Sequence, residues 1–234
     1  MRGYMVAMIS VFVTFSSSIA AAETLALWTF EGNPATLLNS YTINGIKPEL
    51  GTYRAGSEMS GLHRSTNTDY TLELGNGSPS SYKVNTWAPD DYHQFRSIST
   101  GYQNIVVSWD MRSNGTSADE FKLAYSTDGI NFTDSISLLL TGTPWNVVTR
   151  ETLITHYTVN LAALADASAI YLRLVSTEAV WGDSSKYIQM DNFMITGDAI
   201  AVTTIPVTPI PIAAAGGGGL LALLGLGRGG RGRV

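Results

Sequence analysis

Residues 105–112 alternate between apolar and polar side chains, and this pattern constrains the fold more than any other feature of the sequence. One set comprises Ile105, Val107, Trp109 and Met111, and the intervening positions become polar at Ser108, Asp110 and Arg112. Successive side chains of a β-strand point to opposite faces, so the first set is predicted to lie in a core and the second toward water. The same alternation recurs over residues 121–125 and 170–174.

Short runs rich in Val, Ile, Tyr, Phe and Thr recur between clusters of Gly, Asn, Asp and Ser, which is typical of strands joined by turns. Strands are predicted at residues 24–30, 41–46, 70–74, 92–98, 104–112, 120–127, 147–149, 154–160, 170–176 and 186–196, with one helical turn at residues 161–167. Asp128-Gly129 is a hairpin signal, because both turn residues must tolerate positive φ. About ten such strands predict an all-β domain, a two-sheet antiparallel β-sandwich.

The first residues are typical of an exported protein. Arg2 supplies a positive charge, residues 4–15 are apolar, and Ala20-Ala21-Ala22 offers a small-residue cleavage site. We therefore predict a signal peptide with a helical apolar core over residues 1–22, and export through the inner membrane. Residues 23–198 then form one domain, which is long enough for a substantial core.

The charge of this domain argues against nucleic acid as a partner. The chain has 14 Lys and Arg against 19 Asp and Glu. Four of the basic residues lie in the two end segments, so ten remain against 19 acidic residues and the domain carries a net charge near −9. Nucleic-acid binding relies on neutralising phosphates with Lys and Arg. The chain also has no cysteine, so its stability rests on core packing rather than on disulfides.

The C-terminal tail has three parts. Pro209 and Pro211 precede an uncharged run over residues 212–227, which contains Gly216 and Gly217 and is followed by Arg228, Arg231 and Arg233. As a helix rising ~1.5 Å per residue, the run reaches ~24 Å, which is short of the ~30 Å hydrocarbon core of a bilayer. It is therefore a weak permanent anchor, and its arginines are expected to stay on the cytoplasmic side.

This tail resembles the PEP-CTERM class of bacterial sorting signals, which exosortase-type transpeptidases process, although Ile210 stands where that class usually has Glu. Its glycine run also resembles the GlyGly-CTERM class, which a rhomboid-type protease handles. The resemblance implies a sorting signal over residues 209–234 and a sorting transpeptidase or protease as partner. The uncharged, proline-containing composition of residues 199–208 predicts an extended linker. The resemblance also implies a place in the cell envelope, at the cell surface or outside the cell. A plain membrane helix or a flexible tail is the alternative.

Three segments of the predicted sandwich resemble jelly-roll domains of bacterial secreted proteins, which include galactose-binding-like and carbohydrate-binding modules. They are residues 28–32 (WTFEG), 125–132 (YSTDGINF) and 188–193 (IQMDNF). In such modules a structural calcium ion often ties the first strand to the last, and Glu31 and Asp191 occupy the matching places. Calcium takes six to eight oxygens, so carbonyls or waters would complete its shell. The alternative is a surface Glu31 and an Asp191 that accepts hydrogen bonds in a turn.

No pattern of catalytic residues is found, and we expect a protein that is not an enzyme. The histidines His63, His93 and His156 are far apart in the sequence and form no metal-binding motif. His93 and His156 are interpreted as ordinary strand residues. Asp90 and Asp91 are chain neighbours that point apart, so residues 85–91 are interpreted as a solvated turn.

Exposed aromatic rings would indicate sugar binding, because the apolar face of a pyranose packs on a flat ring. Trp28 and Trp109 lie in alternating strands and are predicted to be core residues. Trp87, Trp145 and Trp181 lie beside loops and are the candidate ligand platforms, with Trp181 the first choice. The alternative is that these loop tryptophans close over the ends of the sandwich.

Together these features predict a secreted, non-enzymatic protein of the cell envelope or extracellular matrix, with extracellular polysaccharide as a partner of the sandwich. Two alternatives remain open. One is a polysaccharide lyase or glycosidase on the same jelly-roll-like fold, whose acid and base are distant in sequence; a concave groove with two carboxylates ~5–10 Å apart would favour it. The other is a purely structural surface or adhesion protein.

Overall fold

The computed structural model describes residues 21–31, 42–114, 120–177 and 185–201. The chain divides into two compact units, Met1–Ala201 and Val202–Val234, and every described residue belongs to the first. Nearly all of the signal peptide, most of the linker and the whole sorting signal lie outside the described residues, so the two end helices and the domain boundaries remain predictions. In the described part of the chain, no helix has the length and apolar character that a bilayer crossing requires.

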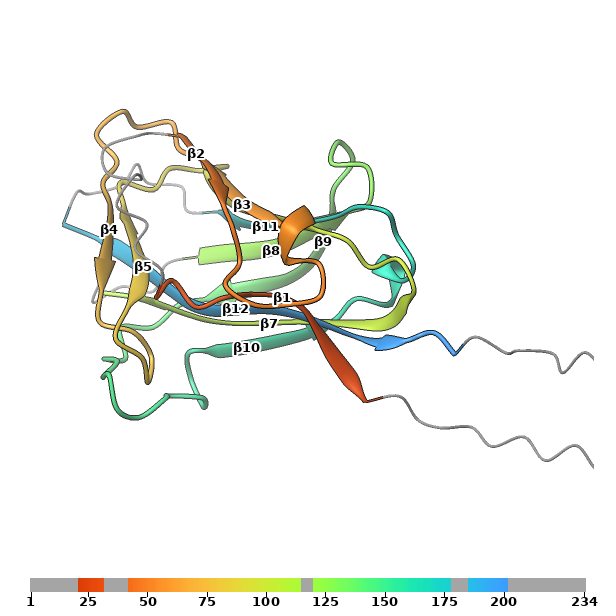
Figure 1. Cartoon of the computed structure of the whole chain (residues 1–234). Helices are drawn as coiled ribbons and strands as arrows, with labels where there is room; N and C mark the ends of the chain where they lie inside the picture. Colours follow the sequence, from red (N-terminus) through yellow and green to blue (C-terminus); the bar gives the residue numbers. More distant parts are fainter. Residues whose placement is uncertain (1–20, 32–41, 115–119, 178–184, 202–234) are drawn as a thin grey trace, which may run out of the picture. The chain divides into compact units, whose positions relative to one another are not determined.

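Two antiparallel sheets of six strands each form the described unit (Figure 1). Sheet A runs in the order β10 (His156–Asn160), β7 (Tyr102–Ser113), β12 (Tyr187–Ala199), β5 (Ser81–Asn85) and β4 (Tyr70–Glu73), and β1 (Ala22–Trp28) pairs with the remaining half of β12. Sheet B runs in the order β2 (Thr42–Ile46), β3 (Glu58–Leu62), β6 (Tyr92–Ser97), β11 (Ile170–Ser176), β8 (Glu120–Ser126) and β9 (Thr133–Leu139). The predicted two-sheet antiparallel sandwich is confirmed.

The core lies between the sheets and is built from the apolar halves of the alternating strands. Phe95 of sheet B stacks on Phe193 of sheet A with 3.5 Å between ring centroids, and Trp28 meets Phe95 edge-on at 5.0 Å. Trp28 and Trp109 are fully buried, as predicted. A Trp or Phe in such a place contributes several kcal/mol of burial and packing free energy, so these rings fix how the two sheets face one another.

The sequence located most strands but missed three and placed one wrongly. The missed strands β3 and β5 are only five residues long, and β9 begins with three polar residues, so each offers few apolar positions for an alternation. The strand predicted at residues 147–149 is a turn, because the Asn146 side chain accepts the N–H groups of Val148 and Thr149 and bends the chain. The predicted helical turn is a short 3-10 helix, Ala162–Leu164.

The predicted Asp-Gly hairpin joins β8 to β9 and is confirmed. Gly129 has a positive φ of 74°, whereas Asp128 does not have one. Asp128 instead acts through its side chain, which accepts the N–H groups of Ile130 and Asn131 and the hydroxyl of Ser126. These donors hold the pKa of the exposed Asp128 carboxyl well below its usual range, so the loop is held by a charged hydrogen-bond acceptor as well as by glycine.

Candidate functional site

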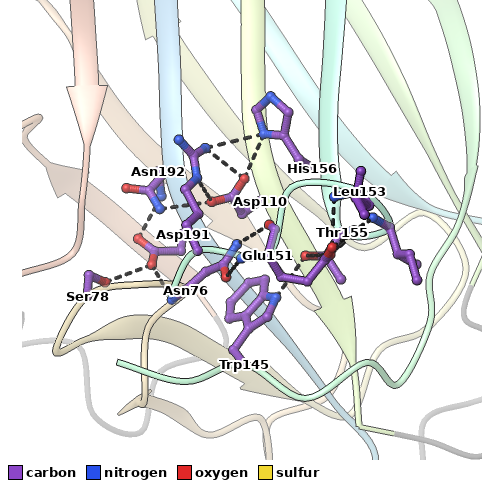
Figure 2. Close-up of polar contacts among 12 residues, drawn as sticks. Asn76, Ser78, Asp110, Trp145, Glu151, Leu153, Thr155, His156, Asp191 and Asn192 are labelled. Carbon is purple, nitrogen blue, oxygen red and sulfur yellow. Dashed lines mark hydrogen bonds and ion pairs between the residues drawn. The ribbon is translucent and has the colours of Figure 1, made fainter. Parts of the chain in front are cut away.

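Three titratable side chains form a row across the outer face of sheet A. The register places His156 of β10 opposite Asp110 of β7, and Asp110 opposite Asp191 of β12. Directly opposed residues on neighbouring antiparallel strands have Cβ atoms about 5 Å apart. With Arg150 and Asn192 they make up the acid cluster, in which Asp110 lies between His156 and Asn192 (Figure 2).

Asp110 is held from three sides. Arg150 donates from Nε to Oδ2 at 2.7 Å and from Nη2 to Oδ1 at 2.8 Å. The Nδ1 atom of His156 lies 2.7 Å from Oδ1, and the side-chain amide of Asn192 donates to Oδ2 at 2.9 Å. The Asp110 side chain has no exposed surface, and its hydrogen bonds raise the pKa of Arg150. Asp110 is therefore a buried charge with its partners in place, as burial of a carboxylate requires.

β12 bulges directly after Asp191, and Asn192 of this bulge also donates to Asp110. The pairing of β12 with β7 shifts between Asp191 and Met194, and Asn192 has a φ of 51°, which asparagine tolerates better than most residues. Asp191 accepts hydrogen bonds from the Asn76 N–H, the Ser78 hydroxyl and the Asn192 N–H. Burial nevertheless raises the pKa of Asp191 to about 7, so this group is half protonated near neutral pH.

Residues 144–155, named here the cover loop, lie over the acid cluster (Figure 2). The Glu151 carboxylate accepts the N–H groups of Leu153, Ile154 and Thr155. The Glu151 main chain exchanges two hydrogen bonds with the Asn76 side chain. Burial opposes ionisation of Glu151, but its three N–H donors outweigh burial and lower the pKa of this carboxyl. The cover loop is thus tied both to itself and to the β4–β5 turn.

The acid cluster is closed to substrate in this arrangement. Asp110 and Asp191 both have a relative exposure of 0%. A cavity of about 300 Å³ lies beside them, but it is lined by cover-loop residues, Arg150 and Leu153 among them, and by neither aspartate. Asp110 and Asp191, the pair of carboxylates that would favour a glycosidase or lyase, therefore lie opposite one another, but the described residues form no open groove between them.

Glu31 and Asp191, the residues expected to hold calcium, bind the same turn between β4 and β5. Glu31 accepts the Ser80 N–H at 3.0 Å, and Asp191 accepts the Ser78 hydroxyl and the Asn76 N–H. Among the described residues, no three His, Cys, Asp or Glu side chains converge as a metal site. The groups around Asp191 are N–H and O–H donors, which suit a carboxylate but do not supply the shell of oxygens that calcium takes. The calcium ion stays a prediction, and no step below depends on it.

Two of the three candidate tryptophan platforms are buried, and the third lies outside the described residues. Trp87 is 5% exposed and packs edge-on against Phe121, and Trp145 is 7% exposed and donates its indole N–H to Thr155. Neither ring offers an open face to a sugar. Their neighbours in sequence are polar loop residues, so only the three-dimensional closure of the loops reveals that the rings point inward. Trp181 lies in the segment 178–184 and is not described.

Buried polar groups also gather between the sheets near residues 85–91, which were expected to form a solvated turn. Asp91 is 1% exposed and accepts the N–H groups of Arg64 and Ala88, and residues 86–88 are buried as well, so that expectation is wrong for most of the segment, although Asp90 is exposed. His63 and His93 are each 1% exposed, with ring centroids 5.6 Å apart. Burial lowers the pKa of His63 to about 3 and that of His93 well below its usual range, so both rings are neutral core residues.

The outer face of sheet B has a different character. Between the buried residues of β6 and β11 lie half-buried polar and aromatic side chains, which share one surface with the end of the β8–β9 hairpin. This surface, named here the arginine face, comprises Ser60, Tyr92, Gln94, Arg96, Phe132, Tyr171 and Arg173. In the register, Gln94 lies between Ser60 and Arg173, and Arg96 lies opposite Tyr171.

Arg173 occupies the centre of the arginine face. Its guanidinium carbon lies 4.1 Å from the Tyr92 ring centroid and 3.8 Å from that of Phe132. Its Nε–H donates to the Gln94 side-chain oxygen at 2.9 Å. Stacking on aromatic rings is favourable for a guanidinium and leaves its edge donors in the plane of the group. The face therefore holds an array in which one cation contacts two aromatic rings.

The β8–β9 hairpin packs against this array. A Cβ atom on Gly129 would lie 3.0 Å from Cζ of Tyr171, so only glycine lets the hairpin backbone approach this ring. The same hairpin carries Phe132 onto Arg173. Sequence reasoning noted that Tyr171 and Arg173 alternate with core residues, but the stacking partner on the hairpin is distant from both in sequence, so the face was missed.

No protein-family model matches the chain, and no curated protein matches it. Among solved structures, it is similar to the CBM22-1–GH10 part of endo-1,4-beta-D-xylanase 10B from Clostridium thermocellum, complexed with xylohexaose, with 18% identity and a TM-score of 0.43 over 78% of this chain and 30% of that one. It is also similar to a CBM22-1–CBM22-2 tandem domain from Paenibacillus barcinonensis (14% identity, TM-score 0.45, 82% of this chain and 50% of that one).

A third similar structure is the K2 cleaved adhesin domain of Lys-gingipain, with 15% identity and a TM-score of 0.42 over 75% of this chain and 99% of that one. This chain thus spans less than a third of the xylanase chain and half of the tandem domain. Identities and TM-scores this low reflect a general likeness of sandwich architecture. The function of this chain must therefore be argued from its own residues.

Proposed function

We propose that this chain is a secreted, non-enzymatic protein of the bacterial cell envelope or extracellular matrix, whose sandwich contacts carbohydrate through the arginine face. The stacked array of Tyr92, Arg173 and Phe132 carries this proposal. Sugars bind flat aromatic surfaces with their apolar faces and take hydrogen bonds from planar polar side chains at the edge. Gln94 and Ser60 lie beside the array and provide such polar groups.

Binding to a glycan array tests the carbohydrate contact. Tyr92→Ala removes one ring of the stack and is expected to weaken binding at least tenfold, which corresponds to about 1.4 kcal/mol. The matched control is Tyr187→Ala in sheet A, since the ring of Tyr187 also has a cation above it, Lys83 at 4.4 Å. Equal binding by the wild type and Tyr92→Ala would place the contact elsewhere on the molecule.

Delivery to the envelope is proposed from the two ends of the chain. The predicted signal peptide over residues 1–22 and the predicted sorting signal over residues 209–234 support the proposal of export and of processing by a transpeptidase or protease. The intact mass of the protein recovered from the native envelope tests this. Loss of residues 1–22 and of a segment that begins near Pro211 or the glycine run is expected. An intact tail through Val234 in the membrane fraction would make the tail an anchor only.

An enzyme of the polysaccharide lyase or glycosidase type is the second candidate, and the pairing of Asp110 with Asp191 favours it. One carboxylate with a raised pKa beside an ionised one is the usual acid–base arrangement of a glycosidase. Complete burial of both groups and the three side chains that bind Asp110 oppose this role. We expect no depolymerisation of polysaccharides that the protein binds; measurable cleavage that Asp110→Asn abolishes would establish the enzyme instead.

A further inference from the structure

Charge is distributed unevenly on the outer face of sheet B. Lys47 pairs with Glu58 at 3.5 Å, and Lys122 pairs with Asp134 at 3.0 Å, so these four charges cancel. Arg173, by contrast, has no carboxylate within ion-pair distance in the described part of the chain. The whole chain has a net charge of −5, so Arg173 is a local exception as an arginine without a described carboxylate partner at the centre of a sheet. An anionic ligand would neutralise its charge.

Arg96 is a second arginine without a carboxylate partner among the described residues. Glu58 is its neighbour across β3 but forms its ion pair with Lys47. In the register Arg96 lies diagonal to Arg173, two residues along from Gln94, and such diagonal neighbours are about 7–8 Å apart. The two arginines therefore lie beside the same strip of surface. Glu120, the acidic residue of β8, is the first residue of that strand, two positions beyond Lys122.

Arg173 is shaped for a carboxylate. Gln94 accepts its Nε–H, and the Tyr92 and Phe132 rings have their centroids 4.1 Å and 3.8 Å from the guanidinium carbon, so the terminal amino groups are the donors that remain without a partner among the described residues. A planar guanidinium binds a carboxylate through two parallel hydrogen bonds. Because the side chain is already fixed by its neighbours, little conformational entropy is lost when the anion binds.

We infer that the polysaccharide bound at the arginine face is acidic, a uronate-containing polymer whose carboxylate is bound by Arg173 with Arg96 as the second cation. This inference rests on the proposed carbohydrate function and names the substrate class of the same face. The tyrosine and phenylalanine rings contact the sugar ring, and the arginines contact its charged substituent. Nucleic acid is a poor fit, since a strongly negative chain with two such arginines neutralises few phosphates.

The test compares polygalacturonate with its fully methyl-esterified form, which has the same backbone without the charge. Alginate and hyaluronan extend the acidic set, and galactan is a neutral polymer. Affinity electrophoresis or calorimetry with the full chain is expected to show at least tenfold tighter binding of an acidic polymer than of the neutral ones, with a preference that falls as NaCl is raised. Arg173→Gln is expected to abolish the preference, and Arg96→Gln is expected to reduce it severalfold.

Arg54→Gln is the matched control, because it removes the same charge from an exposed 3-10 helix that lies outside the face. Thermal midpoints of the three variants show whether each is folded. Equal binding of charged and neutral polymers overturns this inference but leaves the carbohydrate proposal intact. Binding of no polymer overturns both. Binding of dextran sulfate but of no uronate polymer overturns the carboxylate assignment, since the face would then select anions in general.

Discussion

The two outer faces of the sandwich differ in whether their charged side chains have partners within the chain. On sheet A, Asp110 and Asp191 have no exposed surface and their partners come from the same chain: Arg150 of the cover loop binds Asp110, and the β4–β5 turn donates to Asp191. On sheet B, Arg173 is held by two aromatic rings and by Gln94 but has no described carboxylate as partner. A charge that is neutralised internally stabilises a loop, whereas a fixed charge without an internal partner is available to a ligand.

Replacing an arginine on each face is expected to show the largest difference. Arg150→Met leaves the buried Asp110 with fewer donors, and because the Arg150 side chain is itself 41% exposed, the expected loss is about 1–3 kcal/mol of folding free energy rather than that of a fully buried ion pair. Arg173→Met removes the stacking contacts of a partly exposed cation and its hydrogen bond to Gln94, together worth about 1 kcal/mol. Urea unfolding of the full chain measures both values. Similar losses for the two variants would remove the energetic distinction between the faces.

Asp191 is expected to give the acid cluster a pH dependence of stability that the arginine face lacks. The group has a pKa of about 7 when folded and of about 4 when unfolded, so between these pH values folding takes up a proton and stability falls as the pH rises. The total fall is at most about 4 kcal/mol. The stability of the wild type minus that of Asp191→Asn should decline over this window.

Urea unfolding at several pH values between 4 and 8 measures the decline in that difference. The comparison with Asp191→Asn matters because His63, which has a lowered pKa, acts in the opposite direction as the pH falls below about 6.5. A difference that stays constant with pH would mean that Asp191 is ionised throughout the range. The hydrogen bonds to Asp191 would then offset the effect of burial on its pKa.

Replacing Gly129 with alanine is expected to change the shape of the arginine face without changing its charge. Gly129→Ala and Gly101→Ala both place a side chain at a positive φ, of 74° and 81°, which costs about 1–2 kcal/mol. Only the new Cβ at residue 129 meets a ring, Tyr171 at 3.0 Å, whereas nothing lies within 4 Å at residue 101. Gly129→Ala should lose at least as much stability as Gly101→Ala, and only Gly129→Ala should bind glycan severalfold more weakly. Equal glycan binding by the two would exclude the hairpin from the site.

The calcium prediction has the smallest expected effect. If Glu31 and Asp191 hold an ion, millimolar calcium should raise the thermal midpoint by a few degrees through mass action, and chelator should lower it. Glu31→Gln should then lose the response. An unchanged midpoint in calcium and in chelator would reject the ion and leave hydrogen bonds to Ser78, Ser80 and Asn76 as the tie between strand ends.

Much of the fold could be predicted from the sequence, because a period of two marks each strand that has one buried face. Ile105, Val107 and Trp109 are fully buried as their alternation predicts. Strands such as β3, with Ser60 and Gly61, carry too few apolar residues for this signal. They form because neighbouring strands supply hydrogen-bond partners on both sides, and no local pattern records that.

The sites were less predictable because each depends on contacts between distant segments. Asp110 was recognised as polar and outward-facing, but its burial depends on Arg150, forty positions along the chain. The sequence around Trp145 predicted a loop residue with an open ring, but the ring is 7% exposed and its indole N–H donates to Thr155 at the other end of the cover loop. The neighbouring positions of Arg173 and Tyr92 follow from the pairing of β11 with β6, which the sequence alone does not specify.

The side-chain Nε–H signals of two arginines test the central claim most directly. Arg173 donates its Nε–H to Gln94, and Arg150 donates its own to Asp110, so both protons are held by hydrogen bonds and suit detection by NMR. Arg173→Gln and Arg150→Met assign the two signals. On addition of a galacturonate hexamer to the full chain, we expect the Arg173 signal to shift and the Arg150 signal to stay in place. A shift of Arg150 with Arg173 unchanged would move the ligand to the acid cluster and contradict the account.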